Sequence, residues 1–319
     1  MRVLKFGGKS LSSIEKTQNI CKYIRKIYKN NKKIVIVVSA IGNTTNELLL
    51  LAENYSGSKE QNKTDLAKLL STGETVSSAL FSIMLNSMGV PAKSLSAYEL
   101  EISTFGDSTS SRIAYINKTK ILECLNSNTV AVVAGFQGIN KNNEITTLGR
   151  GGSDTTAVAI ASIFETDVEI YSDYSGVFAG DPKFLNFKKI KKASFDIMTK
   201  MAKAGARVLD ARAVSLAKNF NTTIISKSST FPEHYGSIIS NLESDVVSIS
   251  EIDNLSKITV NFTNKNKMNF IVKNVLLYLN DCKFYNLTIN NEEISFYVES
   301  QNKLEILSKL SKKLNLLKK

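Results

Sequence analysis

The chain has 319 residues, of which 43% are hydrophobic and 22% are charged, and its formal net charge is +12. This length is enough for two domains, and the hydrophobic content predicts a packed core and excludes a largely disordered chain. A single histidine and three widely spaced cysteines argue against a histidine-based zinc site and against a disulfide framework.

The sequence around Met1–Lys5 lacks the apolar stretch of a signal peptide, and no apolar run reaches the length of a membrane span. We therefore expect a cytoplasmic protein without a membrane partner. The positive charge would suit a nucleic-acid binder. However, the lysines are spread along the chain, and the densest cluster, Lys183–Lys192, lacks the aromatic stacking pattern of single-strand binders. We expect no nucleic-acid partner and keep a nucleic-acid binder as an alternative.

The first part of the chain alternates apolar strands with helices. Val3–Phe6 predicts a short strand, and the β-branched run Ile34–Val38 predicts a strand buried on both faces of a parallel sheet. Ser12 followed by Glu15 is a capping-box pattern that predicts where the first helix begins. The other predicted elements here are helices at 14–28, 46–54 and 64–88, a strand at 91–96 and a hydroxyl-rich loop at 104–111.

The middle of the chain repeats the same alternation. A strand is predicted at 129–134, and a helix at 157–161 with Ser153 or Asp154 as its N-cap. A strand at 167–171, a turn-rich loop at 174–183, helices at 197–204 and 214–220 and a strand at 222–226 follow. This order predicts an α/β fold, with a mainly parallel sheet sandwiched by helices and ligands at the carboxyl ends of its strands.

Beyond residue 240 the pattern changes to a strand, a helix, two alternating strands and a helix. We therefore predict a catalytic domain over 1–240 and a small α+β domain over 241–319. The predicted elements of the small domain are 258–262, 268–279, 284–289, 294–298 and 304–316.

Two glycine-rich turns carry the chemistry. The stretch Glu144–Ala161 combines glycines, the cation of Arg150 and the carboxylate of Asp154 ahead of a helix, whose N-terminus suits a phosphate or carboxylate. The alternative interpretation is a polar loop that caps a buried helix. The first turn, Gly7-Gly8, is neither a Walker A nor a GxGxxG pattern, but Lys5 on the preceding strand can reach a phosphate held by its backbone.

Seven stretches, in the same order, resemble the aspartate kinases. They are Lys5-Phe-Gly-Gly-Lys-Ser10 (family KFGGTS), Val38-Ser-Ala-Ile-Gly-Asn-Thr-Thr-Asn-Glu-Leu48, Ser71-Thr-Gly-Glu74, Leu148-Gly-Arg-Gly-Gly-Ser-Asp-Thr-Thr-Ala157, Tyr171–Lys183 (family YTDVDGVYTADPR), Ala204-Gly-Ala-Arg-Val-Leu209 (family GAKVL) and Gly236-Ser-Ile-Ile239 (family GTLI). The resemblance implies the amino-acid-kinase fold over the first 240 residues.

The resemblance implies transfer of the γ-phosphoryl of ATP, with Mg²⁺, to the side-chain carboxylate of L-aspartate. The product, 4-phospho-L-aspartate, begins lysine, threonine and methionine biosynthesis in this family. The residues present fit this chemistry, because a carboxylate is already ionised at neutral pH and needs no general base. The protein must instead hold two anions together and neutralise the charge on the transferred group.

The resemblance also assigns roles to individual residues, and it implies no protein ligands for a metal. Lys5 stabilises the transferred phosphoryl group, and Asp154 orients Lys5. The implied aspartate-binding residues are Arg150 for a carboxylate, Glu74 for the ammonium, and Ser39, Thr45 and Ser153 for hydrogen bonds. The implied nucleotide-binding residues are Lys5, Gly7, Gly8, Ser10, Ser172, Asp173, Phe178, Asp181, Lys183 and Arg207. Phe178 could equally be a core residue, and Asp173 and Asp181 could be turn or cap residues.

The sequence departs from the family pattern in several places. Lys9 replaces a threonine, Phe178 replaces a tyrosine, and Asp210-Ala211 replaces a His-Pro pair.

The C-terminal segment has room for a single, truncated ACT-like domain where relatives commonly have two. Its turn Thr263–Met268 has no glycine, so we expect weak or absent feedback by lysine or threonine. The small domain would instead serve a homodimer or a higher homo-oligomer. A kinase of another small acid, such as glutamate, and a catalytically idle regulatory relative remain alternatives.

Overall fold

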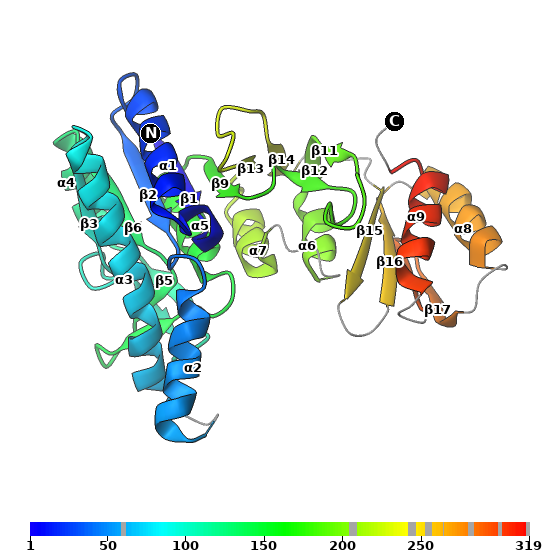
Figure 1. Cartoon of the computed structure of the whole chain (residues 1–319), viewed down its shortest axis with the longest axis horizontal. Helices are drawn as coiled ribbons and strands as arrows, with labels where there is room; N and C mark the ends of the chain where they lie inside the picture. Colours follow the sequence, from blue (N-terminus) through cyan, green and yellow to red (C-terminus); the bar gives the residue numbers. More distant parts are fainter. Residues whose placement is uncertain are drawn as a thin grey trace. The chain divides into compact units, whose positions relative to one another are not determined.

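The computed structural model describes residues 1–58, 62–203, 209–241, 247–252, 257–263, 265–279, 284–298 and 302–316. The chain forms two compact units (Figure 1). Unit 1 contains Met1–Ser175 and Leu216–Tyr235, and unit 2 contains Gly176–Ser215 and Gly236–Lys319. Across the described ranges, no helix combines the length and apolar character needed to cross a bilayer.

The main sheet of unit 1 has six strands in which every neighbouring pair is parallel. In spatial order they are β13 (Ile224–Ser228), β9 (Val168–Ser172), β1 (Arg2–Phe6), β2 (Ile34–Val38), β6 (Val130–Ala134) and β3 (Ala92–Leu95). All their carboxyl ends therefore lie at one edge, as the sequence predicted. Every residue of β2 and β6 is buried, since helices cover both faces of a sheet of this kind.

Alternation along β1 divides the strand between the two faces. Leu4 and Phe6 belong to a buried cluster that includes residues of α1 (Ile14–Tyr28) and α3 (Lys63–Ser87). Lys5 points to the opposite face, where it meets α5 (Gly152–Ile163). The remaining helices are η1 (Gly8–Leu11), α2 (Thr44–Ser56) and α4 (Thr119–Asn126) within unit 1, and α7 (Ala211–Asn219), in which the division between the units falls.

The start of the first helix at Ile14 is confirmed, but two predicted N-caps were wrong. The N-cap of α1 is Ser13, whose Oγ accepts the Lys16 N–H at 3.2 Å, because η1 extends the turn and Ser12 caps η1 instead. The N-cap of α5 is Gly151, in the left-handed region at φ 71°, rather than Ser153 or Asp154. Asp154 does not cap the helix because its carboxylate pairs with Lys5.

A second, smaller sheet in unit 1 was not predicted. Its strands, in the order β5 (Arg112–Tyr115), β4 (Ser103–Phe105), β7 (Gln137–Ile139) and β8 (Ile145–Thr147), are each three or four residues long. The predicted loop at 104–111 therefore begins inside a strand. Hydroxyl-rich sequence conceals the pairing, because the Thr104 and Thr146 side chains bond each other at 2.7 Å inside the sheet.

Unit 2 contains a four-stranded antiparallel sheet with two helices, which agrees with the predicted α+β segment. Its order is β15 (Val247–Ile252), β16 (Lys257–Phe262), β18 (Glu293–Tyr297) and β17 (Tyr285–Ile289), with α8 (Lys265–Leu279) and α9 (Lys303–Lys313). The other elements of unit 2 are the antiparallel pair β10 (Val177–Phe178) and β11 (Lys189–Ile190), the parallel pair β12 (Lys192–Ser194) and β14 (Ser237–Ser240), and α6 (Phe195–Lys203).

Residues 176–215 group with the C-terminal segment, so the units differ from a single division at residue 240. Phe187 and Ala179 belong to the same buried cluster as the apolar face of β16. In addition, the Lys188 N–H donates to the Leu316 carbonyl at 2.8 Å. Whether 1–240 and 241–319 are the independently folding domains stays a prediction.

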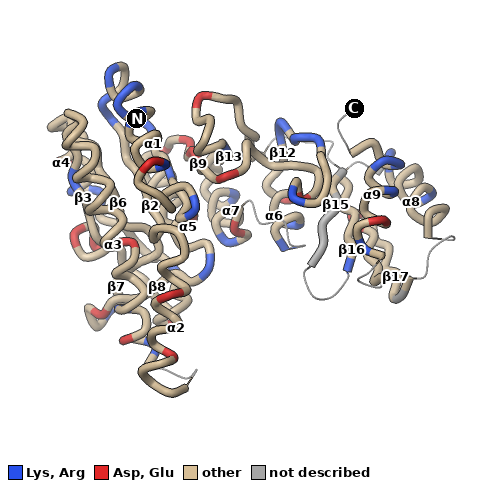
Figure 2. Tube along the Cα trace, in the orientation of Figure 1, with Lys and Arg blue, Asp and Glu red and all other residues tan. Residues whose placement is uncertain are grey.

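Figure 2 shows basic residues distributed over both units among the described residues, consistent with a general compositional bias.

The position of Phe187 can be tested through stability. Phe187 is 2% exposed in the unit 2 core, whereas nearby Phe184 is 38% exposed. We expect Phe187→Ala to lower the free energy of unfolding of unit 2 by about 3–5 kcal/mol, and Phe184→Ala to lower it by less than about 1 kcal/mol. Chemical denaturation of both variants measures this, and equal losses would show that Phe187 is not a core residue.

Candidate active site

The first glycine turn packs tightly against the loop that follows β2. A Cβ on Gly8 would lie 2.4 Å from the Ala40 carbonyl oxygen, so a residue with a side chain does not fit. The Gly42 N–H donates to the Gly8 carbonyl at 2.9 Å, and the Gly7 N–H donates to the Tyr171 carbonyl at 3.3 Å. The turn is therefore held from both sides, by the loop after β2 and by the end of β9.

Lys5 forms a buried ion pair directly beneath this turn. Its Nζ lies 2.5 Å from Asp154 Oδ1, and the two side chains are 10% and 11% exposed. The ammonium is also 3.6 Å from where a Cβ on Gly7 would stand. A partly desolvated cation, fixed by one carboxylate and adjacent to a bare backbone, can stabilise negative charge that develops there.

Close packing of α5 brings Asp154 to Lys5. A Cβ on Gly135 would lie 2.9 Å from Ser153 Cβ, and a Cβ on Gly152 would lie 2.8 Å from Leu148 Cβ. Gly149 and Gly151 adopt left-handed φ values of 70° and 71°, which turn the chain sharply into the helix. The glycines of this stretch thus have a structural cause, and the exposed Arg150 lies in the turn between them.

Glu74 is a buried carboxyl on α3 with one unused oxygen. Its Oε1 accepts the Ala40 N–H at 3.0 Å, and its Oε2 has no hydrogen-bond partner among the described residues. Burial raises the pKa of Glu74 to about 7, while the Ala40 hydrogen bond and the charge of Lys5 act in the opposite direction. Glycine at position 73 permits this close approach, because a Cβ there would lie 2.9 Å from Ala40 Cβ.

The remaining predicted aspartate contacts also lie in unit 1. The Ser39 N–H donates to the Phe6 carbonyl at 3.2 Å, and Ser39 is half-buried. Thr45 is half-buried in the first turn of α2, and Ser153 is buried in the first turn of α5. Ser10, predicted near the nucleotide, is buried, and its Oγ is without a hydrogen-bond partner in the part of the chain that is described.

The other predicted nucleotide residues are divided between the two units. Ser172 and Asp173 follow β9 in unit 1, and the Ser172 Oγ accepts the Tyr174 N–H at 3.2 Å. Phe178 packs against the core cluster of unit 2, which favours its alternative interpretation as a core residue. The Asp181 side chain accepts the Lys183 N–H at 2.9 Å, which is a turn role. Arg207 lies outside the described residues.

Sequence reasoning missed Gln137, which supports the segment of α3 around Glu74. Its Nε2 donates to the Ser71 carbonyl at 3.0 Å and to Thr75 Oγ1 at 3.2 Å, and its Oε1 accepts the Ala97 N–H at 3.1 Å. Gln137 is 2% exposed. A polar residue between two glycines directly after a buried strand was a signal that could have identified it.

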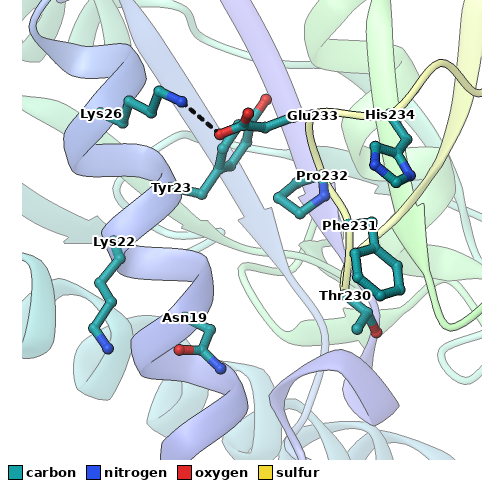
Figure 3. A pocket seen from close by; sticks show the side chains of 9 residues that line it. All are labelled: Asn19, Lys22, Tyr23, Lys26, Thr230, Phe231, Pro232, Glu233 and His234. Atoms are coloured by element: carbon teal, nitrogen blue, oxygen red, sulfur yellow. Dashed lines mark hydrogen bonds and ion pairs between the residues drawn. The ribbon is translucent and has the colours of Figure 1, made fainter.

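A separate hollow of about 430 Å³ lies between α1 and the loop after β13, away from the predicted site residues (Figure 3). One wall presents Tyr23 from α1, and an ion pair between Lys26 and Glu233, 2.8 Å long, joins the two walls. The lining residues are Asn19, Lys22, Tyr23, Lys26, Thr230, Phe231, Pro232, Glu233 and His234.

Comparison with known proteins places the chain in a family. The model of the amino acid kinase family matches residues 1–226. Because this match covers more than half of the sequence, the chain belongs to the amino acid kinase family. The fold class expected from the sequence is thereby confirmed.

Several similar proteins of established name are aspartokinases. The aspartokinase of Geobacillus stearothermophilus is 43% identical over 229 residues, which are 71% of this chain and 56% of that protein. The aspartokinase of Rickettsia conorii is 34% identical over 311 residues, which are 94% of this chain and 77% of that protein. The chain therefore spans little more than half the length of the first relative.

A solved structure gives the same fold. The structure of E. coli aspartokinase III in complex with aspartate and ADP matches with a TM-score of 0.83, covering 99% of this chain and 100% of that chain. The identity over this match is 17%, so the similarity establishes the fold.

The pKa of Glu74 predicts a pH-dependent stability. The usual value of 4.5 rises to about 7 in the folded chain, so folding becomes less favourable as the pH increases through this window. The resulting loss in the free energy of unfolding is on the order of 3 kcal/mol and is complete above about pH 7. In Glu74→Gln this titration is absent. Urea unfolding of both proteins without ligand, between pH 4.5 and 8, should show the wild type losing stability relative to the variant; parallel curves would contradict the assignment.

Proposed function

We propose that the chain is an aspartate kinase, which transfers the γ-phosphoryl group of MgATP to the side-chain carboxylate of L-aspartate and releases 4-phospho-L-aspartate. The observation that carries this proposal is the buried Lys5–Asp154 ion pair beneath the Gly7-Gly8 turn. The names of the relatives, aspartokinases, favour the same activity. As in the family pathway, the product would enter amino-acid biosynthesis in the cytoplasm.

The acceptor carboxylate attacks phosphorus without help from a base, since it is ionised at neutral pH. The role of the protein is then to position the two anions and to stabilise charge on the transferred group. Lys5 supplies that charge, and Asp154 keeps the ammonium in place. Ser10, whose buried hydroxyl has no partner in the described part of the chain, can donate to a phosphate oxygen.

Glu74 gives selectivity for a free amino acid. Its buried, unpaired Oε2 is an acceptor suited to an α-ammonium group, which would also satisfy the desolvated carboxylate. An N-acylated acid lacks that ammonium and would leave the carboxylate unpaired. Arg150 is assigned to a substrate carboxylate, and Ser39, Thr45 and Ser153 to hydrogen bonds with the amino acid.

Within unit 1, nucleotide binding is assigned to Gly7 and Gly8 with Lys5, Ser10, Ser172 and Asp173. The resemblance also implies Phe178, Asp181, Lys183 and Arg207, but the packing of Phe178 in unit 2 and the turn role of Asp181 favour structural roles for these two residues. Mg²⁺, when bound with ATP, would neutralise part of the phosphate charge. Mg²⁺ in such sites usually binds phosphate oxygens and water, and we expect these to supply its ligands. Homo-oligomerisation through the C-terminal segment is also a proposal, which light scattering can test.

One assay distinguishes these possibilities. ADP release is measured with MgATP and a panel of aspartate, glutamate and N-acetylglutamate, and hydroxylamine traps the acyl phosphate. We expect turnover with aspartate alone. An idle relative would give no turnover with any acid, whereas turnover with glutamate would support the alternative substrate.

Lys5 can be tested in the same assay. Lys5→Ala should lower kcat by more than about tenfold, because a positioned donor to the developing charge is lost. Lys22→Ala removes an exposed lysine of α1 outside the predicted site and should leave turnover within about twofold of wild type. If Lys5→Ala turns over at the wild-type rate, Lys5 has no part in the transfer.

A further inference from the structure

A second buried charge cluster lies on the opposite face of β1 and β9 from Lys5. Arg2 Nε donates to Glu169 Oε1 at 2.8 Å, and Lys227 Nζ lies 3.2 Å from Glu169 Oε2. The Tyr171 hydroxyl donates to Glu169 Oε2 at 2.8 Å and lies 3.1 Å from the Tyr23 hydroxyl. These five residues come from β1, α1, β9 and β13, all in unit 1.

The cluster is built around a single carboxylate. Glu169 is 12% exposed at its side chain and meets two cations, Arg2 and Lys227, so the group carries a net positive charge. Lys227 also lies 5.4 Å from the centre of the Tyr171 ring. A well-packed apolar core would fill this space without the cost of desolvating three charges. Stability alone therefore does not explain why these charged residues are placed here.

Tyr171 connects the cluster to the glycine turn. Its ring stacks on Phe6 with centroids 4.8 Å apart, and its carbonyl accepts the Gly7 N–H at 3.3 Å. The chain then continues from Phe6 into Gly7-Gly8 and from Tyr171 into Ser172-Asp173, the two turns assigned to the nucleotide. One end of Tyr171 is thus fixed by Glu169 and Tyr23, and the other end holds the glycine turn.

We propose that Tyr171 is a positioning residue for nucleotide binding: the Arg2–Glu169–Lys227 cluster fixes its hydroxyl, and the fixed side chain sets the spacing between the Gly7-Gly8 and Ser172-Asp173 turns. This inference rests on the proposed function. A phenylalanine at position 171 keeps the stacking on Phe6 but loses the bonds that define where the ring lies. The turn can then shift, and bare amides that must approach a phosphate closely tolerate little displacement.

The test is the affinity for MgADP, measured by calorimetry without an amino acid. Tyr171→Phe should weaken it about five- to tenfold, as expected if part of the free energy of one hydrogen bond to a charged group is lost from nucleotide binding. At saturating nucleotide, kcat should stay within about twofold of wild type, because Lys5 and Asp154 are on the other face of the sheet. Tyr28→Phe is the control, since it removes another tyrosine hydroxyl of α1, which donates to the Asn128 carbonyl at 2.6 Å outside the cluster.

A second pair of variants guards against a folding defect in Tyr171→Phe. Lys227→Arg keeps a cation beside Glu169 and should bind MgADP within about twofold of wild type, whereas Lys227→Met should weaken binding at least about fivefold. Wild-type affinity in both Tyr171→Phe and Lys227→Met, with lower thermal stability, would show a purely structural cluster and overturn the proposal. If wild type itself does not bind MgADP, the proposed function fails instead.

Discussion

The ion pair between Lys5 and Asp154 is the interaction around which the candidate site is organised. It joins the end of the central strand β1 to the first turn of α5, and both side chains are nearly buried. A buried ion pair is costly to desolvate and often contributes little net stability. Its role here is to fix the position of the Lys5 ammonium beneath a glycine turn, where no side chain separates the ammonium from a ligand.

Glycines allow the backbone segments around this ion pair to pack closely. Gly8 lies against Ala40, Gly73 lets α3 approach the same residue, and Gly135 and Gly152 let α5 approach β6 and its following turn. As a result, Glu74 and the Lys5 ammonium are close enough for the charge of Lys5 to oppose part of the rise that burial causes in the pKa of Glu74. Opposite charges and bare amides thus converge at the carboxyl edge of a parallel sheet, which is where ligands bind in α/β folds.

Much of this could be predicted from the sequence, and the exceptions have physical causes. Short, continuous β-branched runs predicted β2 and β6, because such runs favour strands that are covered on both faces. The N-caps at Ser13 and Gly151 were missed because η1 extends the turn before α1, and because Asp154 pairs with Lys5 instead of capping α5. The strand β15, with the alternating sequence Val247-Ser-Ile-Ser-Glu-Ile252, offered a signal that went unused. Arg2 and Glu169 are separated by 167 positions, and one sequence cannot pair such residues.

Transfer requires that the side-chain carboxylate of aspartate itself attacks the γ-phosphorus, and oxygen labelling follows the bond that forms. L-aspartate carrying ¹⁸O in both oxygens of its side-chain carboxylate is turned over with MgATP in the presence of hydroxylamine. Hydroxylamine attacks the acyl carbon, so the bridging oxygen leaves with the phosphate. Attack by the carboxylate yields inorganic phosphate that carries one ¹⁸O atom, detected by its ³¹P isotope shift. Phosphate free of label would mean that water accepts the phosphoryl group, and would exclude aspartate as the acceptor.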